Sequence, residues 1–367
     1  MNSLVGGDYV ASDESNQEIN QMSGSHSENV IRLSICIPTY NRAAFIGETL
    51  RSILPQVGGD VEIVIVDGAS TDNTEQVIAP FRDHFPNLFY HRGVSNKGVD
   101  RDMATAVELA RGEFCWLMSS DDLVKPGAIS KILDEILTSD DIYICDATLC
   151  DYNMKPIRNT SFLSIRRKTN QFNLSDRVQL LQYLSLATSN NALFCYMSTI
   201  VFRRESWINI GYNTLFSGIG YAHVFMLLSF IKTRCTIKYI PFPLVLNRAG
   251  NDSFSSQGIE KRYLLDFDGY LLLANQLFND DHQVRRAFLQ VMTREHPWYR
   301  LVKLRSGMQS PERWEEICVK LLEFGYSRKQ IVFCSIFGRA RFVVNAALYF
   351  NRKFPGSTFL RWFRRAA

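Results

Sequence analysis

Two adjacent carboxylates, Asp121 and Asp122, are the first residues in this chain whose types and spacing could do chemistry. They follow the apolar run FCWL at residues 114–117 and come just before a Lys and a Pro. Like charges that lie close together repel each other, so we expect a cation beside them. The pair therefore predicts a charged site at the end of a core strand.

Strand-like and helix-like segments alternate along residues 30–125, and these elements must position the two carboxylates. Apolar, β-branched runs predict buried strands, and apolar residues at helical spacing predict the helices between them. The predicted strands are LSICIP, VEIVIVDGAS, LFYHRG and EFCWLMSS, and the predicted helices lie within 39–56, from about Asp72 to 85, and within 101–112. Such alternation is typical of an α/β fold with a mostly parallel sheet covered by helices on both faces.

Polar residues follow three of the predicted strands directly, in PTYNR (38–42), DGASTD (67–72) and SSDD (119–122). Ligands of open α/β sheets bind outside the carboxyl ends of the strands. Because parallel strands end at the same edge, the three segments predict one polar crevice there.

Four motifs in this order resemble glycosyltransferase family 2, whose members have the GT-A fold. They are ICIPTYNR, VIVDGASTDNT, NKGVDRDMA and WLMSSDD, and they span roughly residues 32–125. Within the family, the motifs resemble those of bacterial O-antigen and surface-polysaccharide enzymes of the abequosyltransferase-like kind. The resemblance implies an inverting transfer from a nucleoside-diphosphate sugar to a hydroxyl of a lipid-linked or growing surface polysaccharide, of O-antigen or capsule type.

The resemblance also implies a donor site and a divalent cation, Mg²⁺ or Mn²⁺. Family members usually carry Asp-x-Asp where this chain has Ser119, Ser120 and Asp121, so metal binding falls to Asp121 and the neighbouring Asp122. Hard cations prefer carboxylate and phosphate oxygens. The residues implied in nucleotide-sugar binding are Pro38, Thr39, Asn41, Asp67, Ser70, Lys97, Arg101, Ser119, Ser120 and Asp121.

Each of these assignments has a structural alternative that the residues leave open. Asp72, in the same motif as Ser70, has the residue type of a plain helix cap. The loop of Lys97 and Arg101 is equally a solvated loop that opens a helix. Asp121 and Asp122 are equally caps of the helix that follows them.

The catalytic base is predicted from a departure from the family. Relatives supply an acid ahead of a helix in the second half, but FSGIGYAHVFMLLSF (216–230) contains none. An imidazole titrates near neutral pH, so His223 is the candidate base, with Asp252 as second choice. Residues predicted to contact the acceptor or the diphosphate are Tyr221, Arg248, Asn251 and Ser253. The alternatives are a buried core histidine and an ordinary polar turn.

The order of these segments predicts four parts of the chain. They are a polar, disordered segment (1–29), the nucleotide-sugar half (30–125), the acceptor half (126–255), and a helical, basic and aromatic region (256–367). In the last part, basic residues alternate with Phe, Trp and Tyr after Glu323, the last acid of the chain. This composition is typical of peripheral membrane contact and equally of a packed helical subdomain.

Composition narrows the possible partners, the possible metals and the compartment of the protein. The net charge of +4 and the lack of a groove-reading motif argue against nucleic acid as a partner. Eight cysteines without a C-x-x-C pair argue against zinc, and they favour a reducing compartment. We expect a cytoplasmic enzyme, with contact at the inner face of the plasma membrane as an option. A nucleotide-sugar binder without catalysis is the alternative function, because the first Asp and the acidic base are missing.

Overall fold

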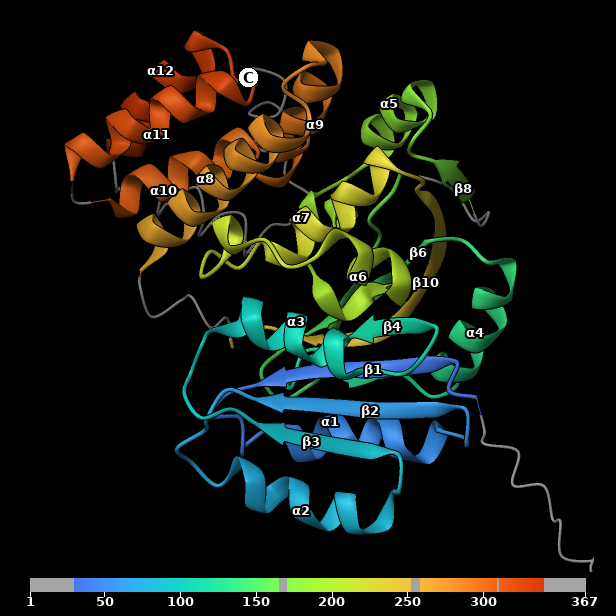
Figure 1. Ribbon diagram of the computed structural model, residues 1–367. Coiled ribbons are helices and arrows are strands. Elements are labelled where there is room, and N and C mark those ends of the chain that lie inside the picture. The colour runs from blue at the N-terminus through green and yellow to red at the C-terminus, as the bar shows by residue number, and fades with distance from the viewer. Residues whose placement is uncertain (1–29, 165–169, 252–257, 309, 340–367) are drawn as a thin grey trace, which may run out of the picture. The chain divides into compact units, whose positions relative to one another are not determined.

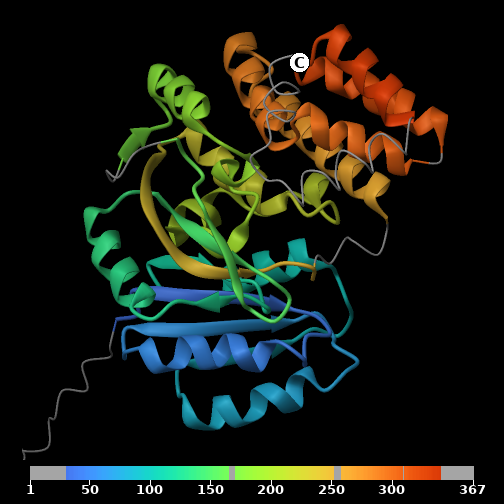
Figure 2. The same ribbon diagram turned by 180° about the vertical axis from the view of Figure 1, so that it is seen from behind.

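The computed structural model describes residues 30–164, 170–251, 258–308 and 310–339 (Figures 1 and 2). The predicted disordered segment 1–29 and the basic end of the chain, 340–367, lie outside the described residues. No helix within the described ranges has the combined length and apolar character needed to cross a bilayer.

The predicted parallel sheet is confirmed in the first half of the chain (Figure 1). Four strands pair in parallel in the spatial order β3-β2-β1-β4. All residues of β1, β2 and β4 are buried, as their apolar composition predicts. The strands are β1 (Leu33–Thr39), β2 (Val61–Asp67), β3 (Leu88–Arg92) and β4 (Phe114–Leu117).

Helices cover both faces of this sheet. Apolar residues of α1 (Ile46–Ile53), α2 (Thr74–His84) and α4 (Ala128–Glu135) belong to one core cluster, and those of α3 (Val99–Leu109) belong to another. Figure 1 shows α1 and α2 on one side of β1 and β2, and α3 on the other. Helix α1 lies within the predicted range 39–56, and Asn41, between β1 and this helix, has a left-handed backbone with φ of 52°.

The second half of the chain extends the same sheet with a change of direction. Strand β9 (Ile200–Arg203) pairs antiparallel with both β4 and β6 (Ile142–Cys150), and β10 (Thr236–Arg248) pairs parallel with β6. Figure 2 shows β10 bending along β6. Three short strands pair antiparallel, namely β5 (Leu123–Val124) and β8 (Asn170–Asn173) with β10, and β7 (Pro156–Thr160) with β6. The sheet is therefore mostly parallel, with antiparallel additions that the sequence did not predict.

The remaining described elements are helical, as expected from residue 258 onward. They are α5 (Arg177–Leu186), α6 (Arg204–Ile210), α7 (Ala222–Ser229), α8 (Ile259–Leu277), α9 (His282–Glu295), α10 (Trp298–Gly307), α11 (Pro311–Glu323) and α12 (Arg328–Arg339). Apolar residues of α7 and α8 belong to the same core cluster as α3. Side chains from α8 can therefore reach a site built on the sheet.

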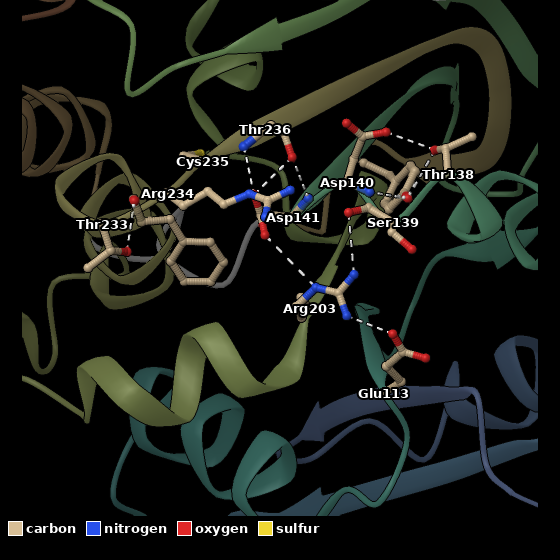
Figure 3. Close-up of polar contacts among 12 residues, drawn as sticks. Glu113, Thr138, Ser139, Asp140, Asp141, Arg203, Thr233, Arg234, Cys235 and Thr236 are labelled. Carbon is tan, nitrogen blue, oxygen red and sulfur yellow. Dashed lines mark hydrogen bonds and ion pairs between the residues drawn. The ribbon is translucent and has the colours of Figure 1, made fainter.

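A polar network joins the amino ends of β6 and β10 to the carboxyl end of β9 (Figure 3). The buried carboxylate of Asp141, next to β6, accepts hydrogen bonds from the backbone N–H and the hydroxyl of Thr236 at 2.8 and 2.9 Å. Arg203 of β9 lies 3.9 Å from Asp141 and pairs with Glu113 at 2.6 Å. The network lies at the edge opposite the carboxyl ends of β6 and β10, where the antiparallel strand β9 ends.

We expect Asp141→Ala to destabilise the fold, because the donors of Thr236 would lose a buried acceptor. Leaving buried donors unsatisfied costs about 1–3 kcal/mol, measurable as a lower free energy of unfolding in urea. The matched control is Asp134→Ala on the exposed side of α4, for which we expect a change within about 0.5 kcal/mol. Equal stability of the two variants would contradict this role for Asp141.

Candidate functional site

Asp67 ends β2 and is fully buried at the carboxyl edge of the sheet. The backbone N–H of Ser70 donates to its Oδ1 at 2.7 Å, and the hydroxyl of Tyr90 donates to its Oδ2 at 2.8 Å. Burial and the Asp67 carboxylate raise the pKa of Tyr90, so the phenol keeps its proton. Nearby on β1, after Pro38, the buried hydroxyl of Thr39 has no hydrogen-bond partner among the described residues. The strand ends thus present one fixed carboxylate and one unused hydroxyl.

The segments after β1 and β2 hold each other in place. The Asn41 N–H donates to Ser70 Oγ at 2.9 Å, and Asn41 Oδ1 accepts from the Thr71 N–H at 2.8 Å. Asp72 accepts from the backbone N–H of Thr74 at 3.0 Å, at the start of α2. These contacts favour the capping interpretation for Asp72 and a positioning role for Asn41 and Ser70.

The two basic residues predicted to lie along the nucleotide differ in their surroundings. Lys97 is exposed in the loop before α3. Arg101 makes two hydrogen bonds to the carboxylate of Glu108, at 3.0 and 2.9 Å, and its guanidinium lies 5.2 Å from the ring centre of Tyr212. The contacts of Arg101 favour a role in holding α3.

Asp121 and Asp122 lie at the end of β4, and their carboxylates have different partners. Asp122 accepts from the hydroxyls of Tyr196 and Ser198 at 2.7 and 2.6 Å and from the Arg248 N–H at 3.0 Å. Burial and the neighbouring Asp121 raise the pKa of Asp122 to about 6. Because protein donors occupy both of its oxygens, the contacts favour a positioning role for Asp122.

Asp121 has only small polar side chains on its carboxylate. Ser119 Oγ donates to Oδ1, and Asn251 Nδ2 donates to Oδ2 at 2.5 Å. Ser120, the residue between Ser119 and Asp121, is buried. The carboxylate of Asp121 therefore keeps lone pairs for a further partner.

The fixed cation beside the pair is Arg248, at the end of β10. Its Nε donates to the Asp121 carbonyl at 2.9 Å, its Nη1 to the Tyr152 carbonyl at 2.5 Å, and its Nη2 to Glu48 Oε2 at 2.6 Å. The guanidinium also lies 5.0 Å from the ring centre of Phe45. The guanidinium is occupied by protein atoms, which favours a clamp over direct contact with a diphosphate.

The oxygen donors around Asp121 fit a hard cation. Across the described ranges, no three His, Cys, Asp or Glu side chains form a group that could hold a metal ion. A carboxylate, a hydroxyl and an amide are, however, ligands that Mg²⁺ and Mn²⁺ accept when phosphate oxygens complete the shell. The chain would thus contribute Asp121 as the charged ligand.

A cavity of about 530 Å³ connects the end of β4 with the start of α7. Asp121 lines one part of it, and Tyr221 and His223 line another. Further polar or charged lining residues are Ser119, Asp122, Arg158, Thr160, Asn191, Tyr196, Asn247, Arg248, Asn251 and Arg262. Two of the predicted donor residues, Ser119 and Asp121, thus share one space with predicted acceptor residues. The other predicted donor residues are not among those that line it, namely Pro38, Thr39, Asn41, Asp67, Ser70, Lys97, Arg101 and Ser120.

His223 lies in the first turn of α7 and is buried. Its Nε2 is 3.4 Å from the Cys195 carbonyl, and its Nδ1 has no partner among the described residues. Burial lowers the pKa of His223, so the imidazole is neutral at neutral pH. A neutral ring with one unpaired nitrogen can accept a proton.

Asp100 connects the donor side to this helix, and the sequence interpretation missed it. Its buried carboxylate accepts from the backbone N–H groups of Gly220 and Ala222 at 2.9 and 3.3 Å, at the start of α7. Carboxylates are stabilising at helix amino ends. The only sequence signal was an acid in the first turn of α3, which does not reveal a partner 120 residues away.

Helix α8 forms another wall of the cavity, also without a sequence signal. The hydroxyl of Tyr221 donates a hydrogen bond to the buried carboxylate of Asp266, and Arg262 donates a hydrogen bond to the same carboxylate. A Cβ at Gly269 would lie 2.6 Å from Cδ2 of Tyr221, so the ring packs where only glycine leaves room. Asp252 and Ser253, predicted as second base and acceptor contact, lie outside the described residues.

Comparison with known proteins agrees with this architecture. The family model "Glycosyl transferase family 2" matches residues 34–208. Abequosyltransferase RfbV of Salmonella typhimurium is 36% identical over 271 residues, which are 72% of this chain and 81% of that protein. Chondroitin synthase of Escherichia coli is 37% identical over 105 residues, 28% of this chain and 15% of that protein.

The solved structures show the same fold at lower identity. The crystal structure of S. aureus TarS 1–349 aligns with a TM-score of 0.58 at 16% identity, over 86% of this chain and 88% of that one. The same protein in complex with UDP-GlcNAc also gives a TM-score of 0.58. This likeness confirms the GT-A fold. Together with the family model and the RfbV relative, it shows that the chain belongs to glycosyl transferase family 2.

Proposed function

We propose that this glycosyltransferase moves a sugar from a nucleoside-diphosphate donor to a glycan hydroxyl, with inversion and with Mg²⁺ or Mn²⁺. The observation that carries the proposal is the cavity shared by Asp121 and His223. The RfbV relative, an abequosyltransferase, supports abequose or a similar sugar as the group transferred. The acceptor we propose is a lipid-linked or growing surface polysaccharide of the O-antigen or capsule type.

The donor would lie along the carboxyl edge of the sheet. In this proposal Thr39 and Asp67 hydrogen-bond the nucleoside. Thr39 Oγ1 is buried without a partner in the described chain, and each Asp67 oxygen keeps a lone pair beside the one hydrogen bond that it accepts. Asp121 is placed to bind the cation that the diphosphate shares. When bound there, the cation would stabilise the negative charge that develops on the departing diphosphate.

In the proposed reaction, the acceptor hydroxyl attacks the anomeric carbon of the donor sugar from the side of the cavity. The acceptor hydroxyl oxygen bonds to the anomeric carbon as the bond from that carbon to the phosphate oxygen breaks, which inverts the configuration. The hydroxyl proton passes to the neutral imidazole of His223, and the nucleoside diphosphate leaves. Asp100 positions the amino end of α7, and with it His223.

Removing the charge of Asp121 should abolish most of the activity. We expect Asp121→Asn to lower kcat/KM about a hundredfold or more, because electrostatic stabilisation of the leaving group is lost. The measurement is the release of nucleoside diphosphate with Mn²⁺, against Asp134→Asn as a matched exposed control. A chelator should stop the wild-type reaction, and added Mn²⁺ should restore it. Full activity of Asp121→Asn, or after chelation, would refute metal use at this site.

His223 should control proton transfer and the acid side of the pH profile. We expect His223→Ala to lower kcat about 10²- to 10⁴-fold with little change in donor affinity. Because the neutral imidazole is the active form and burial lowers its pKa, the wild-type rate should fall only below pH 6.5. Stopped assays of initial rate across pH, with donor Kd measured in parallel, check this. A variant with near-normal turnover would remove His223 from the mechanism.

We also propose that the C-terminal helical region contacts a membrane surface through α12. Val332 and Ile336 lie one helical turn apart on α12 and are 55% and 61% exposed. Arg328 and Lys329 begin the same helix and Arg339 ends it. An amphipathic helix with basic ends is attracted to anionic lipid headgroups. Most of the predicted basic segment, residues 340–367, lies outside the described residues.

The protein should therefore sediment with anionic vesicles better than with neutral ones. We expect Ile336→Glu to reduce binding to phosphatidylglycerol vesicles at least about threefold, because it adds a like charge and removes apolar area. The control is Val178→Glu on α5, an equally apolar residue that is 72% exposed. Equal binding to neutral vesicles, or equal loss in both variants, would argue against this surface.

A further inference from the structure

Asp102 is a buried carboxylate at the donor side that the proposed reaction does not use. It lies in the first turn of α3 and is 7% exposed. A Cβ at Gly68 would lie only 2.5 Å from Asp102 Oδ2, so this carboxylate lies directly over the backbone of Gly68. Gly68 follows Asp67 at the end of β2. Asp102 is therefore placed beside Asp67, where a nucleoside would lie.

Asp102 differs from the buried carboxylates around it in lacking a donor. Asp67 accepts two hydrogen bonds, and Asp100 also accepts two. Within the part of the chain that the structure describes, nothing donates a hydrogen bond to the carboxylate of Asp102. Buried polar groups in native proteins are nearly always hydrogen-bonded, because desolvation without a partner is costly. The oxygens of Asp102 are not among the fully buried polar atoms, so solvent reaches them in the free protein, and a ligand bound over them would supply the donors instead.

The charges around Asp102 decide which kind of ligand fits. Burial first, and then the negative charge of Asp67 on β2, raise the pKa of Asp102 to about 6. Arg101 on the same helix and Lys97 in the preceding loop oppose this shift. A diphosphate would be repelled by two neighbouring carboxylates, whereas N–H and O–H groups of an uncharged nucleoside would satisfy them.

We propose that Asp102 binds the nucleoside of the sugar donor, accepting hydrogen bonds from its base N–H or ribose O–H groups. This inference rests on the proposed function and adds a residue to its donor site. Gly68 is part of the same arrangement, since any side chain there would displace the carboxylate. Lys97 and Arg101 then affect donor binding indirectly, because their positive charges favour the ionised carboxylate of Asp102.

Donor affinity should consequently depend on pH. A ligand that donates hydrogen bonds favours the ionised carboxylate, so binding is strongest above pH 6 and weakens as the pH falls through about 6. One proton taken up by the free protein at that pKa predicts about a fourfold rise in Kd between pH 7.5 and pH 5.5.

The test is calorimetric titration with UDP-glucose, GDP-mannose, CDP-glucose and dTDP-glucose, each with Mn²⁺, using the tightest binder for the pH series. These donors carry no terminal phosphate, so no phosphate group of the ligand titrates near pH 6. We expect Asp102→Ala to raise Kd at least about tenfold at pH 7.5, as for a lost hydrogen bond to a charged group. Asp102→Asn should reduce the pH dependence to the part that Asp122, whose pKa is also about 6, contributes, and Gly68→Ala should weaken binding like Asp102→Ala.

A purely structural role for Asp102 predicts donor binding that its substitution leaves unchanged, whereas the effect of Asp102 on stability is expected under either role. The folded pKa lies above the ordinary value of 3.8, so Asp102 costs the fold stability as the pH rises above 3.8, and the cost is complete above about pH 6. Asp102→Asn should therefore melt at a higher temperature than wild type at pH 8, with the difference closing below pH 4. Wild-type affinity and pH dependence in the Asp102 variants would overturn the inference while leaving the proposed function standing. Wild-type protein that binds none of the four donors, and none of the corresponding free nucleoside diphosphates with Mn²⁺, would overturn both.

Discussion

The clamp between β10 and the acidic end of β4 is the interaction on which the rest of the site depends. Asp121 and Asp122 are buried neighbours, so their charges are both desolvated and mutually repulsive. Arg248 offsets this through its backbone N–H on Asp122 and its guanidinium on the Asp121 carbonyl, and Glu48 holds that guanidinium in turn. Because protein groups already donate hydrogen bonds to both oxygens of Asp122, Asp121 is the carboxylate of the pair that can bind a cation shared with a diphosphate.

A second constraint joins the two halves of the reaction. Asp100 on α3 caps the amino end of α7, and His223 lies in the first turn of that helix. Helix α3, which borders the proposed donor site, therefore also fixes the position and direction of α7. Buried carboxylate–amide contacts of this kind resist displacement, since breaking them leaves a buried charge unpaired. In the mechanism we propose, a base held in this way does not need to move toward the acceptor.

Local patterns were sufficient to predict the elements but not the partners of the buried polar groups. The apolar runs of β1, β2 and β4 predicted buried parallel strands, and the polar residues after them placed Asp67 and Asp121 at one edge. Sequence periodicity contains no information on which strand pairs with which, so the antiparallel position of β9 between β4 and β6 was missed. For the same reason the ion pair of Arg248 could not be predicted, because its partner Glu48 lies 200 residues away in the sequence. The role of Asp102 could not be predicted from the sequence, because it depends on the position of the carboxylate over Gly68.

The central claim is that the chain offers one carboxylate, Asp121, to a cation whose other charged ligands come from the donor. Titration of Mn²⁺ by electron paramagnetic resonance, with and without a saturating nucleoside diphosphate, tests this claim most directly. The account predicts weak Mn²⁺ binding to the protein alone and at least about tenfold tighter binding once the diphosphate is present, since phosphate oxygens must complete the coordination. Tight Mn²⁺ binding without nucleotide, or nucleotide binding that is indifferent to Mn²⁺, would contradict it.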